Sequence, residues 1–195
     1  DEAVESHQKA LRIKPGHSKA HNNLGLALKE LGKLEEAIES YQKALRIKPD
    51  YAEAHNNLGI ALKEQGKLEQ ALESYQRALN IKPGLAEVHS NLGNLLREMG
   101  RLEEAVARCQ KAVDIKPNLA EAHDHLGVVL QNLGKLEEAF TSHRRAVVLD
   151  PNNNSFWAGL AASLETLSFT SIDDKLLQDL VHILEQPPVR PFQVS

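Results

Sequence analysis

From residue 52 to residue 83 the chain reads AEAHNNLGIALKEQGKLEQALESYQRALNIKP. Near copies of this stretch recur every 34 residues and begin at Ser18, Ala52, Ala86 and Ala120. A fixed period of this length is typical of a stacked repeat array. Each unit of such an array packs only on its neighbours, so the array builds an extended surface and not a catalytic pocket.

One copy of the repeat predicts two helices. Apolar residues follow helical spacing on both sides of Gly66, and a glycine between two such runs marks a turn. Pro83 ends the second run because proline cannot continue a helix. Gly59 and Ala71 are small where the two helices must cross closely, and Tyr75 fills the space between them. The sequence therefore predicts an all-α fold built from helix pairs.

The small residues and the proline recur in register in four successive copies. They are Gly25, Gly59, Gly93 and Gly127; Ala37, Ala71, Ala105 and Ala139; Ala44, Ala78, Ala112 and Ala146; and Pro49, Pro83, Pro117 and Pro151. This pattern resembles the tetratricopeptide repeat (TPR) family, and the resemblance implies a right-handed superhelical solenoid of antiparallel helix pairs. The usual tryptophan of the fourth place is replaced by His21, His55, His89 and His123. This substitution, with the asparagine that follows it, is similar to the repeats of O-linked N-acetylglucosamine transferase and of bacterial TPR proteins.

The repeat register divides the chain into six segments. They are the second half of a truncated repeat at 1–17, four repeats at 18–51, 52–85, 86–119 and 120–153, and divergent capping helices with a linker at 154–195. The half repeat at the start suggests a fragment of a longer array. In the last segment, Ser171 and Asp174 resemble a capping box ahead of one more amphipathic helix. The segment around Phe169 also resembles those that join bacterial repeat arrays to a methyltransferase-like domain.

The resemblance places the sixth residue of each repeat in the concave groove of the superhelix. These residues are Asn23, Asn57, Asn91 and His125. A side-chain amide offers both a donor and an acceptor, so a ladder of asparagines can pair with the backbone of an extended peptide whatever its sequence. The alternative is that these asparagines are only solvated polar residues, and His125 interrupts the ladder.

A basic residue follows six places later, at Lys29, Lys63 and Arg97. These side chains are candidates to meet acidic groups of a ligand in the same groove. The alternative is that they are ordinary surface charges, since a glutamate follows each of them and partly cancels the field.

No catalytic or metal constellation emerges from the sequence. Repeated histidines on successive stacked helices lie about 10 Å apart, too far to share a zinc ion at about 2 Å per bond. Cys109 occupies the place of Tyr75 inside the packing and is predicted to be an inert core residue. A phosphate-binding glycine loop, a nucleophile elbow and an H-E-x-x-H motif are all missing from the sequence. We therefore expect no enzyme activity in this chain, no cofactor and no metal.

Composition limits the classes of partner. The net charge of −4 argues against a general nucleic-acid binder. The sequence has no apolar run of the roughly 18 residues that a membrane helix requires. A single cysteine predicts a reducing compartment, and hence a cytoplasmic protein.

The predicted function is a protein-binding or peptide-binding scaffold that uses the concave groove. One alternative is the non-catalytic, substrate-presenting arm of a larger glycosyltransferase or methyltransferase. Another is a purely structural array that assembles with itself. The lone helix at the start, with Val4, Leu11 and Ile13, is further expected to form homo-oligomers, because one neighbour cannot cover its apolar surface.

Overall fold

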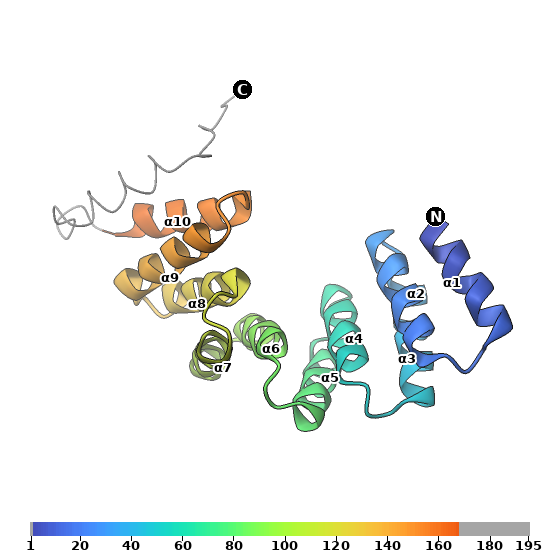
Figure 1. Ribbon diagram of the computed structural model, residues 1–195. Helices are drawn as coiled ribbons and strands as arrows, with labels where there is room; N and C mark the ends of the chain where they lie inside the picture. Colours follow the sequence, from blue (N-terminus) through green and yellow to red (C-terminus); the bar gives the residue numbers. More distant parts are fainter. Residues whose placement is uncertain (1, 168–195) are drawn as a thin grey trace. The chain divides into compact units, whose positions relative to one another are not determined.

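The computed structural model describes residues 2–167, which form ten helices and no strand. The helices are α1 (Glu2–Ile13), α2 (Ser18–Glu30), α3 (Leu34–Ile47), α4 (Ala52–Glu64), α5 (Leu68–Ile81), α6 (Ala86–Glu98), α7 (Leu102–Ile115), α8 (Ala120–Asn132), α9 (Leu136–Leu149) and α10 (Asn154–Thr166). The predicted all-α fold of antiparallel helix pairs is confirmed (Figure 1). The predicted capping box at Ser171, the helix after it and the segment around Phe169 lie outside the described residues.

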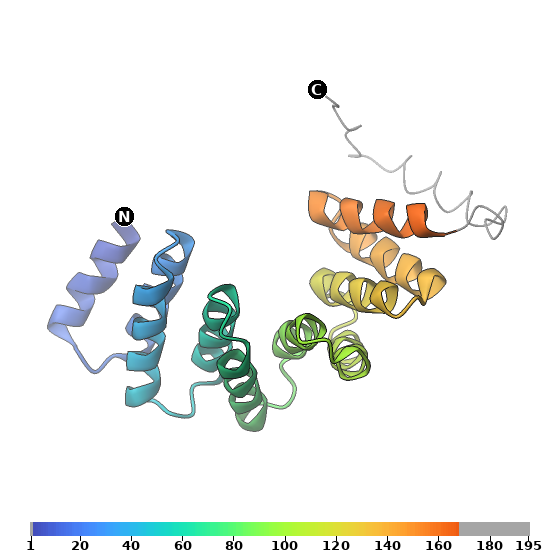
Figure 2. The ribbon, with the colours of Figure 1, turned by 180° about the vertical axis from the view of Figure 1, so that it is seen from behind.

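The chain divides into two compact units, Asp1–Leu95 and Leu96–Ser195. In unit 1, α2 packs against α3 and α4 against α5, while α1 packs on α2 and α3 on α4. Figure 2 shows α1 to α5 following one another as a stack. In unit 2, α8 packs against α9, with α7 on α8 and α10 on α9. Within α1–α5 and within α7–α10, each helix thus contacts the helices next to it in sequence, which is the packing of a repeat array.

A glycine makes the turn inside each helix pair. Gly66 follows α4 with a φ of 77°, a left-handed conformation that residues with a Cβ atom rarely adopt. Its N–H donates to the Lys63 carbonyl, and the Lys67 N–H donates to the Leu62 carbonyl, both at 2.9 Å. These two bonds form a Schellman motif, which satisfies the last carbonyls of the helix. Gly32, Gly100 and Gly134 have φ values of 73°, 75° and 72° and make the corresponding turns.

Tight packing inside each pair depends on a second glycine. The Tyr75 ring is fully buried and lies so close to Gly59 that a Cβ atom there would be 2.6 Å from its Cε1 atom. Tyr41 and Gly25 make the same arrangement in the preceding repeat. Ala71 and Ala78 are also completely buried, so the small residues of the repeat are those at which the helices touch.

Candidate functional site

The sixth-place asparagines of unit 1 are linked across repeats. The Asn57 Nδ2 atom on α4 donates a hydrogen bond of 3.0 Å to the Oδ1 atom of Asn22 on α2. One repeat later, the Asn91 Nδ2 atom donates to the Oδ1 atom of Asn56 at 3.1 Å. The sixth-place amides of Asn57 and Asn91 therefore each pair with the fifth-place amide of the repeat before.

These bonds fix the orientation of the asparagines. Asn57 and Asn91 are half-buried, and each uses one amide N–H for the inter-repeat bond. Among the described residues, the Oδ1 atom and the second amide N–H of each make no other hydrogen bond. A row of oriented amide acceptors and donors is what an extended backbone requires of a binding surface.

The fifth-place asparagine is a residue that the sequence argument did not assign to the site. Asn22 is only 4% exposed, and its Nδ2 atom lies 3.5 Å from the Oδ1 atom of Asn23. Asn22 is therefore placed to orient Asn23 and Asn57 and not to contact a ligand itself. The signal in the sequence was the adjacent pair of asparagines in both repeats, Asn22 with Asn23 and Asn56 with Asn57.

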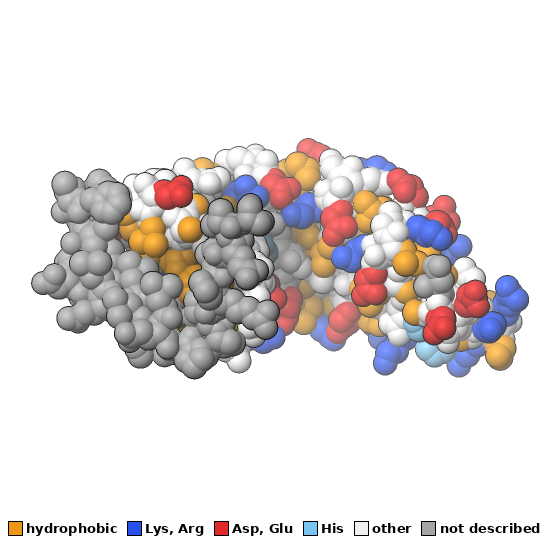
Figure 3. All heavy atoms as spheres, turned by 90° about the horizontal axis from the view of Figure 1, so that it is seen from above, with side chains coloured by type: hydrophobic (Ala, Val, Ile, Leu, Met, Phe, Trp, Pro, Cys, Tyr) orange, Lys and Arg blue, Asp and Glu red, His pale blue; other side chains and the backbone are white. Residues whose placement is uncertain are grey.

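Two of the three basic residues of the predicted site, Lys29 and Arg97, lie near acidic side chains. The Lys29 Nζ atom lies 3.5 Å from the Oε1 atom of Glu64 in the next repeat, and the Arg97 Nη2 atom lies 3.4 Å from Glu98. Lys63 is half-buried. Exposed pairs of this kind contribute only about 0–1 kcal/mol. Over unit 1, at the right of Figure 3, basic and acidic side chains are interspersed.

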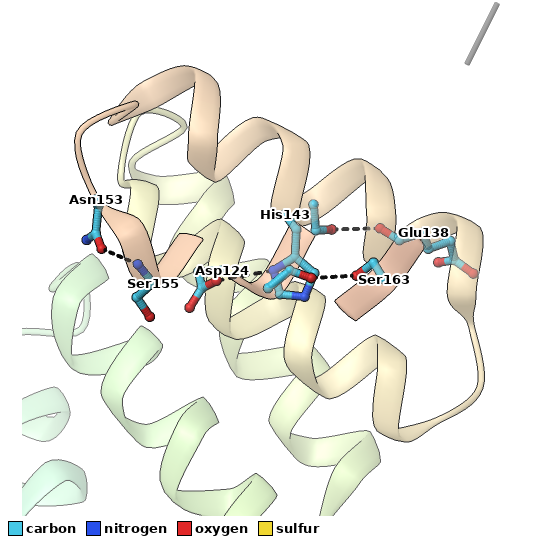
Figure 4. Close-up of polar contacts among 8 residues, drawn as sticks. Asp124, Glu138, His143, Asn153, Ser155 and Ser163 are labelled. Carbon is cyan, nitrogen blue, oxygen red and sulfur yellow. Dashed lines mark hydrogen bonds and ion pairs between the residues drawn. The ribbon is translucent and has the colours of Figure 1, made fainter. Parts of the chain in front are cut away.

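The ladder changes in unit 2. Asp124, at the fifth place of its repeat, lies 3.1 Å from the Nδ1 atom of His143, which is completely buried at the place of Tyr75 (Figure 4). In the next helix pair the sixth place is Gly159, and a Cβ atom there would be 2.7 Å from the same nitrogen. The amide pair between repeats is thus replaced by a pair of the buried His143 and the half-buried Asp124, which Gly159 covers. The predicted groove residue of this repeat, His125, is half-buried.

Sequence profiles of known families match most of the chain. Two profiles described as tetratricopeptide repeat match residues 8–39 and 120–153. A third, described as TPR repeat, matches residues 26–66, 61–96 and 93–134. The chain belongs to the tetratricopeptide repeat family. A search of curated protein sequences finds no match.

Solved TPR structures share this fold. YrrB, described as a TPR protein with an unusual peptide-binding site, is 23% identical with a TM-score of 0.66, and the match covers 96% of this chain and 95% of YrrB. TTC0263, a thermophilic TPR protein of Thermus thermophilus, is 23% identical with a TM-score of 0.72, over 83% of this chain and 89% of that one. The pilF protein of Pseudomonas aeruginosa is 29% identical with a TM-score of 0.70, over 76% of this chain and 68% of that one.

The histidines that replace the usual TPR tryptophan are structural. The Nε2 atom of His55 lies 2.9 Å from the carbonyl oxygen of Pro49, and Trp157 donates through Nε1 to the Pro151 carbonyl at the same distance. A carbonyl oxygen only accepts, so Nε2 is the nitrogen that carries the proton. His21, His89 and His123 make the same bond to the proline six residues earlier. Histidine and tryptophan therefore have the same role here, tying the inter-repeat turn to the following helix.

The repeated histidines and Cys109 all lie within residues 2–167. That range holds no cluster of three or more His, Cys, Asp or Glu side chains arranged to bind a metal ion. Cys109 is fully buried, and this burial raises the pKa of its thiol to about 12. None of the described helices is long and apolar enough to cross a membrane.

Proposed function

We propose that unit 1 is a protein-interaction scaffold that binds an extended peptide segment along its first helices, with Asn23, Asn57 and Asn91 as the rungs. The observation that carries the proposal is the inter-repeat bond from Asn57 to Asn22, repeated from Asn91 to Asn56. These bonds hold the amides in place before a ligand arrives. Pre-organisation lowers the entropy lost on binding, which strengthens otherwise modest hydrogen bonds. The peptide-binding site ascribed to YrrB, a protein of the same fold, supports the proposal.

The spacing of the rungs suggests the conformation of the peptide. Packed helices lie about 8–10 Å apart. A polyproline-II chain rises about 3.1 Å per residue and returns to the same face every three residues, or about 9.3 Å. We therefore expect successive rungs to pair with every third residue of the ligand. Because the contacts are made to the backbone, the groove should accept many side-chain sequences.

The test begins with a peptide selected on the whole chain from a library of random dodecapeptides, followed by fluorescence anisotropy on variants. Asn57→Ala should weaken binding about fivefold, since a hydrogen bond contributes about 1 kcal/mol. The matched control is Gln76→Ala, an exposed amide on α5 for which affinity should not change. Selected peptides that bind the Asn57→Ala and Asn91→Ala variants as tightly as the parent chain would refute the ladder.

The buried Asn22 separates orientation from direct contact. Asn22→Ala removes the acceptor that orients Asn57 and should weaken binding although this side chain is 4% exposed. Asn22→Asp retains an oxygen acceptor and should restore most of the affinity. The chain itself carries aspartate at this place in its fourth repeat, at Asp124. If Asn22→Asp and Asn22→Ala lower the peptide affinity equally, the inter-repeat bond does not orient the site.

A further inference from the structure

A hollow of about 670 Å³ lies in unit 1 on the side of the second helices. Its walls are α3 and α5, and its floor is α4. Leu58 and Leu62, which form the floor, are four residues apart and share one face of α4. The ladder residue Asn57 is not among the residues that line the hollow. This is a second surface of the same unit, distinct from the asparagine ladder.

The base of the hollow is apolar. Leu58 and Leu62 are almost fully buried at its floor, and half-buried Leu45 and Ile81 extend the apolar surface up the two walls. Sites that bind ligands are concave, mostly apolar and typically about 300–1,000 Å³ in volume. The hollow is therefore large enough for a large aliphatic or aromatic side chain and part of the backbone that carries it.

Basic side chains stand on both walls. Arg46 lies on α3 and Arg77 on α5, both exposed, and neither makes an ion pair or hydrogen bond with any described residue. Glu73, one turn before Arg77, is the acidic residue of the lining. Two positive charges against one negative charge leave the rim positive, in a chain whose net charge is −4.

We propose that this hollow is a second peptide-binding site, for a protein segment that places one large apolar side chain on the Leu58–Leu62 floor and acidic residues on either side of it. The apolar side chain supplies the driving force, since burial of a leucine-sized group is favourable wherever it leaves water. Arg46 and Arg77 supply selectivity, because their charges attract carboxylates and repel basic flanks.

The charge arrangement belongs to unit 1 and not to every repeat. One repeat earlier, Arg12 on α1 stands at the place of Arg46, and Lys43 on α3 stands at the place of Arg77. In unit 2 the place of Arg46 is held by Asp114, which accepts a 2.9 Å hydrogen bond from Gln110. Arg145 stands there at the place of Arg77. An acidic peptide should therefore favour unit 1, and Arg145 is a control in the same register.

The experiment titrates the full chain, labelled at its methyl groups and amides for NMR, with three acetylated and amidated heptapeptides. The first is Gly-Glu-Asp-Leu-Asp-Glu-Gly, the second replaces its leucine by glycine, and the third replaces its acidic residues by lysine. Only the first should shift the methyl groups of Leu45, Leu58, Leu62 and Ile81, which report on the hollow. Binding of any of the peptides to the ladder is followed separately at the side-chain amides of Asn57 and Asn91. The affinity of the first peptide should also fall as salt screens the exposed charges.

Charge variants test the two walls. Arg46→Glu with Arg77→Glu should weaken the first peptide about tenfold, because two exposed attractions, each worth a few-fold, become repulsions. Glu73→Gln should strengthen it about twofold. Arg145→Glu and Asn57→Ala should leave it unchanged, and the latter separates this site from the ladder. Arg46, Glu73, Arg77 and Arg145 are exposed, so replacing them is expected to leave the melting temperature unchanged.

Several results would overturn the proposal. They are equal shifts of the hollow's methyl groups by the acidic and basic peptides, an affinity unaffected by the double arginine variant, shifts confined to the ladder asparagines, and no binding of the acidic peptide at millimolar concentration. The proposal would also be refuted if these methyl signals shifted with chain concentration but did not respond to peptide. The hollow would then be assigned to a second copy of the chain.

Discussion

Replacement of Gly59 by alanine tests the packing on which the helix pair depends. A Cβ atom at this position would lie 2.6, 2.8 and 3.0 Å from the Cε1, Cδ1 and Cζ atoms of Tyr75. Carbon atoms in good contact are about 3.5–4.0 Å apart. The ring must therefore move by most of an ångström, although it is fully buried.

Two effects of opposite sign set the magnitude. Overpacking of a well-packed core costs about 1–3 kcal/mol, and three close ring atoms place this site in the upper part of that range. Alanine in a helix interior gains about 1 kcal/mol over glycine. We therefore expect Gly59→Ala to lower the free energy of unfolding by about 1–2 kcal/mol.

The Tyr75→Ala background should reverse the sign of the effect. With the ring removed, Gly59→Ala has nothing to clash with, and it should stabilise the chain by up to about 1 kcal/mol through helix propensity alone. Urea denaturation followed by circular dichroism measures all four members of the cycle. A loss of the same size in both backgrounds would refute the reasoning, because the cost would then not come from the ring.

Three further predictions address other parts of the chain. Cys109, with its pKa raised from 9.0 to about 12, should carry about a thousandfold less thiolate at pH 8 than an exposed thiol. Iodoacetamide should therefore label it only after unfolding, and prompt labelling of the native chain would contradict this burial. Asp124→Ala removes the partner of the buried His143 Nδ1 atom, whose ring Nε2 atom already has no partner within the described residues, and should destabilise unit 2 by about 1–3 kcal/mol. An unchanged urea midpoint would show that the pair contributes nothing to stability. Helix α1 has no buried residue and Ile13 is 87% exposed, so light scattering should show concentration-dependent self-association that Ile13→Glu reduces. A parent chain that stays monomeric at millimolar concentration would contradict this prediction.

The sequence predicted the helix pairs because their signals are local and repeated. Gly66 and Pro83 mark the turns, and Gly59 opposite Tyr75 marks the crossing, at the same places in successive copies. For the repeated histidines, the sequence argued only against a shared metal site and did not predict what they bind. The bond to the preceding proline depends on the path of the turn, which residue types alone do not reveal.

Features that depend on contacts between repeats were not predicted. The pairing of Asn57 with Asn22 joins residues 35 positions apart and needs the stacking of α2 on α4. The pair of Asp124 and buried His143 under Gly159 is a coordinated change in three residues, and the pattern of a single repeat does not link them. The hollow between α3 and α5 likewise arises only when neighbouring repeats are packed.

Recognition of a peptide backbone by the asparagine ladder is the central claim, and backbone methylation tests it most directly. The measurement compares the affinity of a selected dodecapeptide with that of an analogue N-methylated at two backbone nitrogens three residues apart. If the Oδ1 atoms of Asn57 and Asn91 accept hydrogen bonds from those nitrogens, the analogue should bind at least about tenfold more weakly, since two bonds of about 1 kcal/mol each are lost. Alanine side chains at the same two positions should have little effect. In the Asn57→Ala and Asn91→Ala double variant the two peptides should bind alike, whereas an N-methylated peptide that binds the parent chain as tightly as the unmodified one would contradict the claim.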